Sequence, residues 1–316
     1  MRRERALRGV AAFVAIICGL CASATAAARA DLPGGGGSPV RLWTIHYRAH
    51  DGRLRPAYVL LPSWYGPELN PPLPLIISPH GRGVDALVNA RVWGRLPALG
   101  RFAVVNPEGQ GRRLELYSWG NTGQIADLAR MPTIVHRALP WLRIDPHRIY
   151  AFGGSMGGQE TLLLVAHHPR LLAGAAAFDA PTNMIVRYRD FAALPYGHEI
   201  QELARDEIGG PPRRDRRAYL ARSPLDVARK IAFSGVPLQL WWSRADRVVV
   251  DQARQSGLLF REIKRLNPDA NVTEFVGDWA HTAEMRASSR LPIALGLFGL
   301  LPANYARYGA RGSQTI

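Results

Sequence analysis

A single serine, Ser155, sits in the glycine cluster GGSMG, which follows the apolar run RIYAF and precedes the run QETLLLVAHH. The cluster fits the pattern G-x-S-x-G, in which a sharp strand-to-helix turn pushes the serine Oγ out toward substrate. Such a turn permits only small neighbours, so we expect Gly153 and Gly157 to clear space around it. Gly154 and Gly158 are expected to be packing choices. The pattern predicts that Ser155 is a nucleophile.

Two phosphate-binding interpretations of the same glycines fit less well. A phosphate loop ends in Gly-Lys-Ser/Thr, and no lysine lies near this cluster. A dinucleotide site needs the spacing G-x-G-x-x-G with an acidic residue at the end of the next strand. Asp179 does end the next predicted strand, but the glycine spacing is absent. The cluster therefore favours a nucleophile over a phosphate site.

A serine hydroxyl needs a base to take its proton, and the base needs an acid to orient it. Behind a G-x-S-x-G serine the chain order is Ser, then Asp or Glu, then His. His281, in GDWAHTAE, is the one histidine of nine that follows the last candidate acids. Asp246, in SRADRVV, is the favoured acid and Asp179 is its rival, whereas Asp251 and Asp278 are weaker candidates. The non-catalytic alternatives are that His281 is a surface histidine and that Asp246 is a loop aspartate that caps a turn.

The tetrahedral intermediate of acyl transfer needs two hydrogen-bond donors for its oxyanion. The backbone N–H of Met156, at the start of the predicted helix, is expected to supply one. The other is expected from the backbone of Arg82, in the glycine-containing loop SPHGRG. His80 in the same loop is interpreted as a buried ring that bonds neighbouring loops.

The elements that must position these residues alternate between strands and helices. After a β-hairpin around Asp51-Gly52, short apolar runs ending in turn residues predict buried strands in LPLIISPHG, RFAVVNPEG, HRIYAFGGS, LLAGAAAFDAP, VPLQLWWSRAD and ANVTEFVG. Helical spacing lies between them, with Pro132 and Pro140 expected at bends or ends. A last helix is predicted from about Ala283 to Leu300. This order predicts an α/β fold with a mostly parallel sheet and helices on both faces.

The regular alternation lapses at residues 182–232, which are polar, rich in arginine and broken by glycine and proline. We interpret this segment as a helical cap insertion over one end of the sheet. Its aromatic residues either shape a substrate pocket or only seat the cap; they are Tyr188, Phe191, Tyr196 and Tyr219. The basic run at 211–219 is interpreted as a solvated loop, with contact to an anionic surface as the alternative.

The first 30 residues have an arginine-rich start, an apolar run and a small-residue end, the layout of a secretory signal peptide. The apolar run is too short for a membrane span of about 20 residues, so no stable membrane insertion is expected. The sequence thus predicts a signal peptide at 1–30, a flexible linker at 31–40, a catalytic domain at 41–302 and a tail at 303–316. Secreted or periplasmic localisation follows from that leader.

Both cysteines, Cys18 and Cys21, lie in the leader, which excludes disulfides, thiolate catalysis and cysteine metal sites from the mature chain. The whole chain has 40 basic and 25 acidic residues; without the leader's five arginines and one glutamate the formal net charge is +11. The arginines are scattered rather than gathered in a stripe with aromatics, so no nucleic-acid partner is expected.

With these motifs in order, the chain resembles the α/β-hydrolase superfamily from about Trp43 to Leu300. The resemblance is carried by HGRG, DPHRIYAFGGSMGG, WWSRADRVV and WAH. It is similar to the branch with secreted esterases, dienelactone-hydrolase-like proteins and prolyl-oligopeptidase-type peptidases. The resemblance implies a triad of Ser155, Asp246 and His281 with no cofactor and no metal. The loop HGRG departs from the HGGG of many lipases by placing a large side chain there.

The sequence therefore predicts an exported serine hydrolase that acts on carboxylic esters, small or polymeric, through an acyl-enzyme. The alternative is a serine peptidase of the prolyl-oligopeptidase type acting on short peptides. Such a peptidase needs a carboxylate for the free amino terminus, for which Glu108 and Glu199 are candidates. A non-catalytic binding protein that kept the hydrolase fold is a third hypothesis.

Overall fold

The computed structural model describes residues 38–302 and residue 304. The predicted signal peptide lies outside these residues, as do most of the predicted linker and the predicted tail. No helix among the described residues has both the length and the apolar character to cross a membrane.

The chain enters its sheet through a β-hairpin. Strand β1 (Val40–Arg48) pairs antiparallel with β2 (Leu54–Pro62) over the whole length of both. Gly52 has φ of 81° in the turn, a conformation that glycine adopts without strain, and its N–H bonds to the Ala49 carbonyl. The predicted hairpin is confirmed.

Eight strands form one sheet in the order β1-β2-β4-β3-β5-β6-β7-β8. β2 runs antiparallel to β4, and every pair from β4 to β8 is parallel. These strands are β3 (Leu73–Ile77), β4 (Ala103–Pro107), β5 (Ile144–Gly154), β6 (Gly174–Phe178), β7 (Leu238–Ser243) and β8 (Val272–Gly277). The inner strands are buried throughout because helices cover both faces. The predicted mostly parallel α/β sheet is confirmed.

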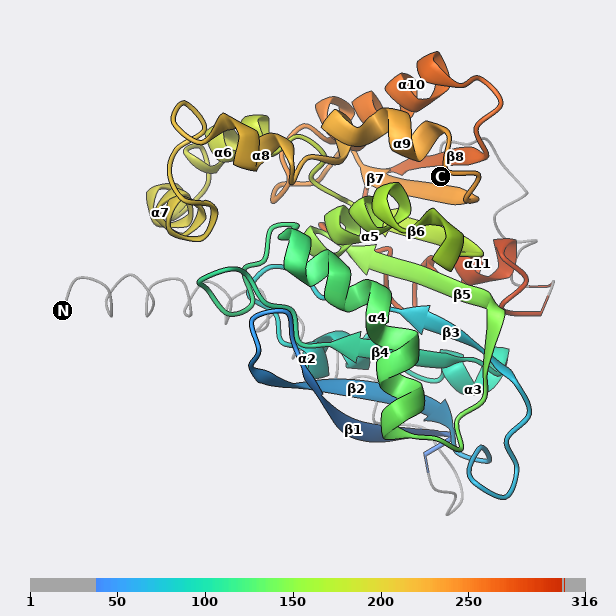
Figure 1. Ribbon diagram of the computed structural model, residues 1–316. Helices are drawn as coiled ribbons and strands as arrows, with labels where there is room; N and C mark the ends of the chain where they lie inside the picture. The colour runs from blue at the N-terminus through green and yellow to red at the C-terminus, as the bar shows by residue number, and fades with distance from the viewer. Residues whose placement is uncertain (1–37, 303, 305–316) are drawn as a thin grey trace.

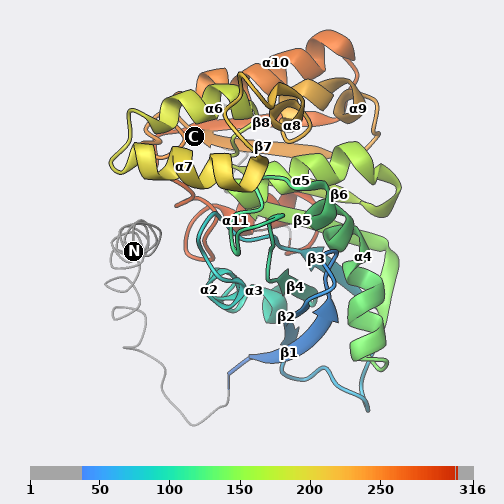
Figure 2. The ribbon, with the colours of Figure 1, turned by 60° about the vertical axis from the view of Figure 1, so that its left-hand side comes forward.

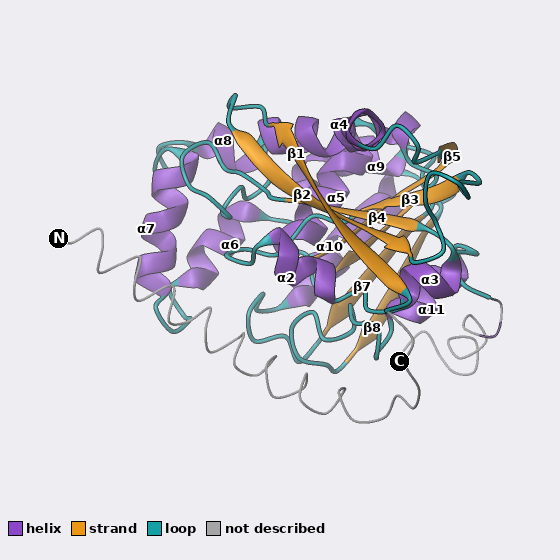
Figure 3. Cartoon of the chain, turned by 90° about the horizontal axis from the view of Figure 1, so that it is seen from below, coloured by secondary structure: helices purple, strands orange, loops and turns teal. Residues whose placement is uncertain are grey.

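Helices pack on the two faces of this sheet around separate apolar clusters (Figure 3). One cluster includes residues of α4 (Thr122–Ala138), α5 (Met156–His167), α9 (Ala228–Ala232) and α10 (Ser256–Leu266). The other includes residues of α2 (Ala86–Arg91), α3 (Leu96–Gly100) and α11 (Leu291–Leu297). Short 3-10 turns lie at Pro169–Leu171, Pro224–Val227 and Gln252–Arg254.

Pro132 lies inside α4, and Pro140 follows the end of that helix, where a proline was expected. One helix boundary differs from the sequence expectation. The last helix begins at Leu291 rather than at Ala283. The preceding segment instead turns back on itself, with the Arg290 N–H bonded to the Glu284 carbonyl and Thr282 at φ 55°. A helix through this segment would remove the loop that carries His281.

The region from α6 to α8 lies beyond the carboxyl ends of the parallel strands (Figures 1 and 2). It contains α6 (Met184–Phe191), α7 (Gly197–Ile208) and α8 (Arg216–Leu220), and we call residues 184–220 the cap. A third apolar cluster joins cap residues to Trp119 and Met156 of the main body. The α9 segment, which the sequence assigned to the insertion, packs instead in the main core through Ala228, Ile231 and Ala232.

Candidate active site

Ser155 forms the turn between β5 and α5, with φ 57° and ψ −125°. This backbone region is strained for any residue with a side chain. Ser155 donates its N–H to the Phe178 carbonyl of the neighbouring strand at 2.8 Å. A Cβ on Gly153 would lie 2.3 Å from the Gly157 oxygen, and one on Gly157 would lie 2.2 Å from the Pro79 oxygen. The expected need for small residues at these two positions is confirmed.

The other two glycines of the cluster are also closely packed. A Cβ on Gly154 would lie 3.0 Å from the Thr282 methyl group. A Cβ on Gly158 would lie 2.9 Å from the Gly153 carbonyl oxygen, which is main chain and cannot rotate away. Gly158 is therefore more constrained than the packing choice that we expected.

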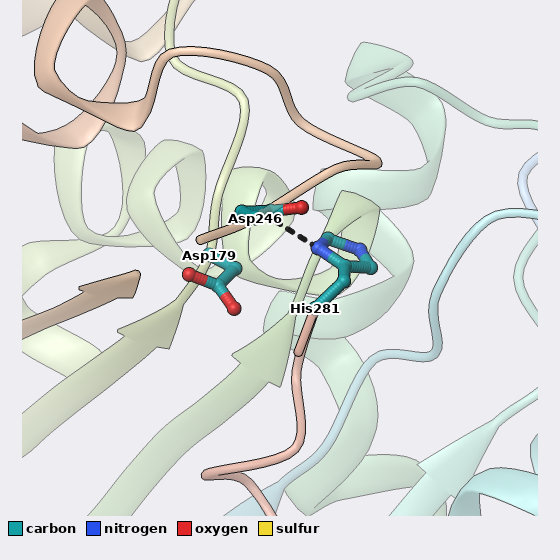
Figure 4. A group of neighbouring side chains, drawn as sticks. All are labelled: Asp179, Asp246 and His281. Carbon is teal, nitrogen blue, oxygen red and sulfur yellow. Dashed lines mark hydrogen bonds and ion pairs between the residues drawn. The ribbon is translucent and has the colours of Figure 1, made fainter. Parts of the chain in front are cut away.

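His281 and Asp246 are bonded directly: His281 Nδ1 lies 2.8 Å from Asp246 Oδ2 (Figure 4). The Asp246 carboxylate also accepts the N–H groups of Val248 and Val249 and the amide of Gln252. Burial alone raises the pKa of Asp246, but the His281 charge and these hydrogen bonds outweigh it and lower the pKa below its usual value. An ionised carboxylate on Nδ1 leaves Nε2 free to face a hydroxyl.

The loop that carries His281 packs against the serine turn through its next residue, Thr282, which contacts the position of Gly154. No hydrogen bond joins Ser155 to His281 among the residues the structure describes. Such bonds are often long before substrate binds and shorten in the substrate complex. The structure thus brings His281 and Asp246 into direct contact and places their loop beside Ser155.

Asp179, the rival acid, holds the loop rather than the histidine ring. Its Oδ1 accepts the Ser243 N–H at 2.8 Å, and its Oδ2 accepts the Thr282 N–H at 2.8 Å and the Trp279 indole N–H at 3.2 Å. Burial raises the pKa of Asp179 to about 6, against the effect of the nearby His281 charge. This positioning role was not predicted from the sequence, although Trp279 stands two residues before His281.

The two weaker candidates for the triad acid pair with arginines and, among the described residues, not with His281. Asp251 pairs with Arg254, and Asp278 pairs with Arg244 in an exposed ion pair. Neither bonds to His281 within the part of the chain that the structure describes.

Three ligand atoms of Asp179, Asp246 and His281 lie within 4.8 Å of one another, a spacing that a metal ion could use. The oxygens of both carboxylates already accept N–H donors, and His281 Nδ1 is bonded to Asp246. A cation would have to displace several of these bonds. The donor set therefore fits orientation of an imidazole better than coordination of a metal.

The loop after β3 lies against the serine turn, as an oxyanion loop must. A Cβ on Gly81 would lie 3.9 Å from the Ser155 Cβ. His80 accepts the Gly109 N–H on Nε2 at 2.7 Å, so its Nδ1 donates to the Gly81 carbonyl at 2.8 Å. The structural role expected for His80 is confirmed. The loop also holds Arg82, whose backbone N–H was expected to face the oxyanion.

Met156, the other expected oxyanion donor, is anchored through its side chain. Its sulfur accepts the Trp119 N–H at 3.3 Å and lies 3.6 Å from the Ser118 hydroxyl oxygen. The same hydroxyl bonds to Glu160, one turn further along α5. Burial raises the pKa of Glu160 to about 7, although bonds from Ser118 and Gln124 favour its charged form. The loop at Ser118 and Trp119 thus holds the start of α5 through both Met156 and Glu160.

Several residues of the candidate site have a strained backbone conformation. Eight described non-glycine residues have positive φ, and three of them carry the site: Ser155 at 57°, Asp179 at 45° and Thr282 at 55°. Thr282 is β-branched, for which this conformation is unusual. Such outliers persist where surrounding bonds fix them, and they are common at active sites.

The aromatic residues of the cap differ in burial and in the contacts that they make. Phe191 and Tyr219 are fully buried, and Tyr219 donates its hydroxyl to the Gly210 carbonyl. Tyr196 is 48% exposed. Tyr219 therefore helps to seat the cap, whereas Phe191 lies under two arginines, Arg82 and Arg187.

Neither carboxylate considered for a peptide amino terminus contacts the triad among the described residues. Glu108 accepts the Ala86 N–H at the start of α2 at 2.8 Å. Glu199 lies in the first turn of α7. A cavity of about 220 Å³ lined by Gly120, Leu163, His167 and four other residues includes no triad member, so the site is identified by its chemistry.

Comparison with known proteins agrees with this fold. Residues 123–275 match the prolyl oligopeptidase family, a segment from α4 to β8 that includes Ser155 and Asp246 and ends before His281. No curated protein sequence matches the chain.

Solved structures with the same fold include both peptidases and a hydrolase of another kind. The acylaminoacyl peptidase of Pyrococcus horikoshii is 16% identical, with a TM-score of 0.59 over 89% of this chain and 43% of that one. The S-formylglutathione hydrolase FrmB of Staphylococcus aureus is 16% identical, with a TM-score of 0.54 over 77% and 92%. Dipeptidyl peptidase 4 of Porphyromonas gingivalis is 16% identical, with a TM-score of 0.57 over 81% and 34%. The chain thus spans about a third of that peptidase and most of FrmB.

Proposed function

We propose that the chain, a serine hydrolase of the α/β-hydrolase superfamily, cleaves carboxylic esters through an acyl-enzyme on Ser155. One observation carries the proposal: the 2.8 Å contact between His281 Nδ1 and Asp246 Oδ2, on a loop that packs beside the strained serine turn. Asp246 fixes the tautomer that leaves His281 Nε2 as the base.

In the first half-reaction, Ser155 Oγ attacks the ester carbonyl carbon as its proton passes to His281 Nε2. The N–H groups of Met156 and Arg82 stabilise the negative charge on the carbonyl oxygen. The tetrahedral intermediate then expels the alcohol, which takes the proton from His281. In the second half-reaction, water loses a proton to His281 as its oxygen attacks the acyl carbon. The second tetrahedral intermediate then releases the acid, and Ser155 Oγ takes the proton back from His281.

A peptidase remains the second candidate, because residues 123–275 match the prolyl oligopeptidase family. An esterase is favoured because Glu108 is already bonded to the Ala86 N–H and Glu199 has no contact with the triad among described residues. We also propose export, on the strength of the leader-like residues 1–30 alone.

Fluorophosphonate labelling of the chain from Asp31 onward tests the mechanism. Labelling of wild type that is lost in Ser155→Ala and kept in Ser288→Ala, an exposed serine, would support the nucleophile. p-Nitrophenyl acyl esters and aminoacyl p-nitroanilides then separate esterase from peptidase. If wild type is neither labelled nor active on any of these, the non-catalytic binding protein replaces the proposal.

A further inference from the structure

Two arginines meet over one buried ring beside the candidate active site. The Arg187 guanidinium carbon lies 4.5 Å from the centroid of Phe191, and that of Arg82 lies 5.8 Å from it. Arg187 and Phe191 belong to α6 of the cap, whereas Arg82 belongs to the oxyanion loop. The contact therefore spans the boundary between cap and main body.

Arg187 is buried without a charged partner. Its side chain belongs to a residue that is 3% exposed, and its Nη1 has no hydrogen-bond partner. Neither Arg187 nor Arg82 forms an ion pair with a described residue. Asp190, one turn along α6, does not neutralise Arg187 by contact, since its own buried Oδ2 also lacks a partner. Stacking on Phe191 offsets only a small part of the cost of burying a cation.

The other buried arginines each have a carboxylate partner. Arg55 lies 3.2 Å from Asp51, and Arg222 lies 3.6 Å from Glu207. Among the three buried arginines of the described residues, only Arg187 has no carboxylate partner. A buried charge is ordinarily paired, so a missing partner points to one supplied from outside.

The Arg187 charge lies within electrostatic range of the oxyanion loop and of the triad acid. Burial and, less strongly, the charge of Arg82 lower the pKa of Arg187 to about 9, while Asp246 and Asp190 act in the opposite direction. Arg187 is thus close enough to feel both the oxyanion loop and the triad acid. Phe191 also shares an apolar cluster with Met156, the residue after the nucleophile.

We infer that Arg82 and Arg187 bind a carboxylate of the substrate, so that this hydrolase selects esters carrying a free carboxylate near the scissile bond. The inference rests on the proposed ester hydrolysis. A guanidinium pair suits a carboxylate because its N–H groups match the two oxygens of that group. The carboxylate would supply the missing partner of Arg187 and relieve its repulsion with Arg82.

Matched ester pairs test the inference and locate the carboxylate. The acyl arm compares 4-nitrophenyl hydrogen adipate with its methyl ester, and the alcohol arm compares 4-acetoxybenzoate with its methyl ester. We expect wild type to prefer the anionic ester in one arm by about tenfold or more in kcat/KM, the value of one charged hydrogen bond. Arg187→Gln should reduce that ratio by about tenfold, and Arg187→Lys should keep part of it.

Arg189→Gln is the matched control, because Arg189 lies on the same helix and is exposed. It should keep the wild-type ratio. If Arg187→Gln does not fold, Arg82→Gln is used in its place, since it keeps the backbone N–H. Competitive inhibition of neutral-ester hydrolysis by monomethyl adipate supplies a further measurement on wild type.

Neutral-ester turnover with no anionic preference in either arm and no carboxylate inhibition would overturn the carboxylate site alone. An unchanged ratio in the arginine variants would do the same. Absence of both labelling and turnover of every ester would instead defeat the proposed hydrolase.

Discussion

Around the triad, the carboxylates of Asp179 and Asp246 together accept N–H groups from six neighbouring residues besides His281. In the cap, by contrast, Arg187 Nη1 and Asp190 Oδ2 are buried with no partner. The carboxylates of Asp179 and Asp246 are bonded on both oxygens without a ligand, because they must hold one geometry throughout the reaction. The second region is incomplete, which is what a specificity site looks like before substrate arrives.

The largest effect is expected from the triad acid. Asp246→Asn should reduce kcat by about 10⁴-fold, because the amide no longer holds the reactive tautomer of His281. Asp179→Asn should cost only about tenfold, since Asp179 orients the loop. Steady-state hydrolysis of a neutral p-nitrophenyl ester measures both. Equal losses of kcat in the two variants would show that Asp246 and Asp179 do not differ in role as we propose.

Removal of the ring under the arginines tests how firmly the cap is seated. Phe191→Ala should lower the free energy of unfolding by about 4 kcal/mol, since it empties a fully buried aromatic site. Urea unfolding followed by tryptophan fluorescence measures the change. Tyr196→Ala, at an exposed aromatic of the same region, is the comparison and should cost far less. A loss below 1 kcal/mol for Phe191→Ala would mean that the cap rests only loosely on the body.

Glu160 makes stability depend on pH. Its pKa in the folded chain is raised to about 7 from an ordinary 4.5, so the folded state keeps a proton that the unfolded state loses. The associated stability is present below pH 4.5 and is lost as pH rises through 7, by about 3 kcal/mol. Glu160→Gln should remove this part of the decline. Unfolding free energies of both proteins at pH 5 and pH 8 give the difference, and parallel curves would contradict the assignment.

The smallest effect is expected at a polar contact inside the cap. Arg205 donates to the Tyr188 hydroxyl at 2.9 Å, and Tyr188→Phe removes this acceptor from a partly exposed pair. The unfolding free energy should fall by about 1 kcal/mol or less, because water can replace the lost bond. A loss above 2 kcal/mol would show that the cap, like the triad region, depends on its polar bonds.

The sequence predicts the sheet and the order of the three triad candidates because these depend on local signals. A glycine turn must hold Ser155, and strand ends must precede Asp246 and His281. The last helix was placed eight residues too early because the loop around Thr282 is held by Asp179, a contact across the sheet. The burial of Arg187 could not be predicted, because nothing in the sequence distinguishes it from the other arginines among the 38 in the chain. Partnerless burial is a property of tertiary packing alone.

The contacts that hold the Met156 side chain limit how the cap could be exchanged by protein engineering. The Met156 sulfur accepts the Trp119 N–H, and its side chain belongs to the same apolar cluster as the cap helices. An exchange of the cap for that of another hydrolase would therefore disturb the residue whose backbone serves the reaction. A chimera designed to change selectivity should keep the contacts of Met156 with Ser118 and Trp119 and vary only the residues around Arg187.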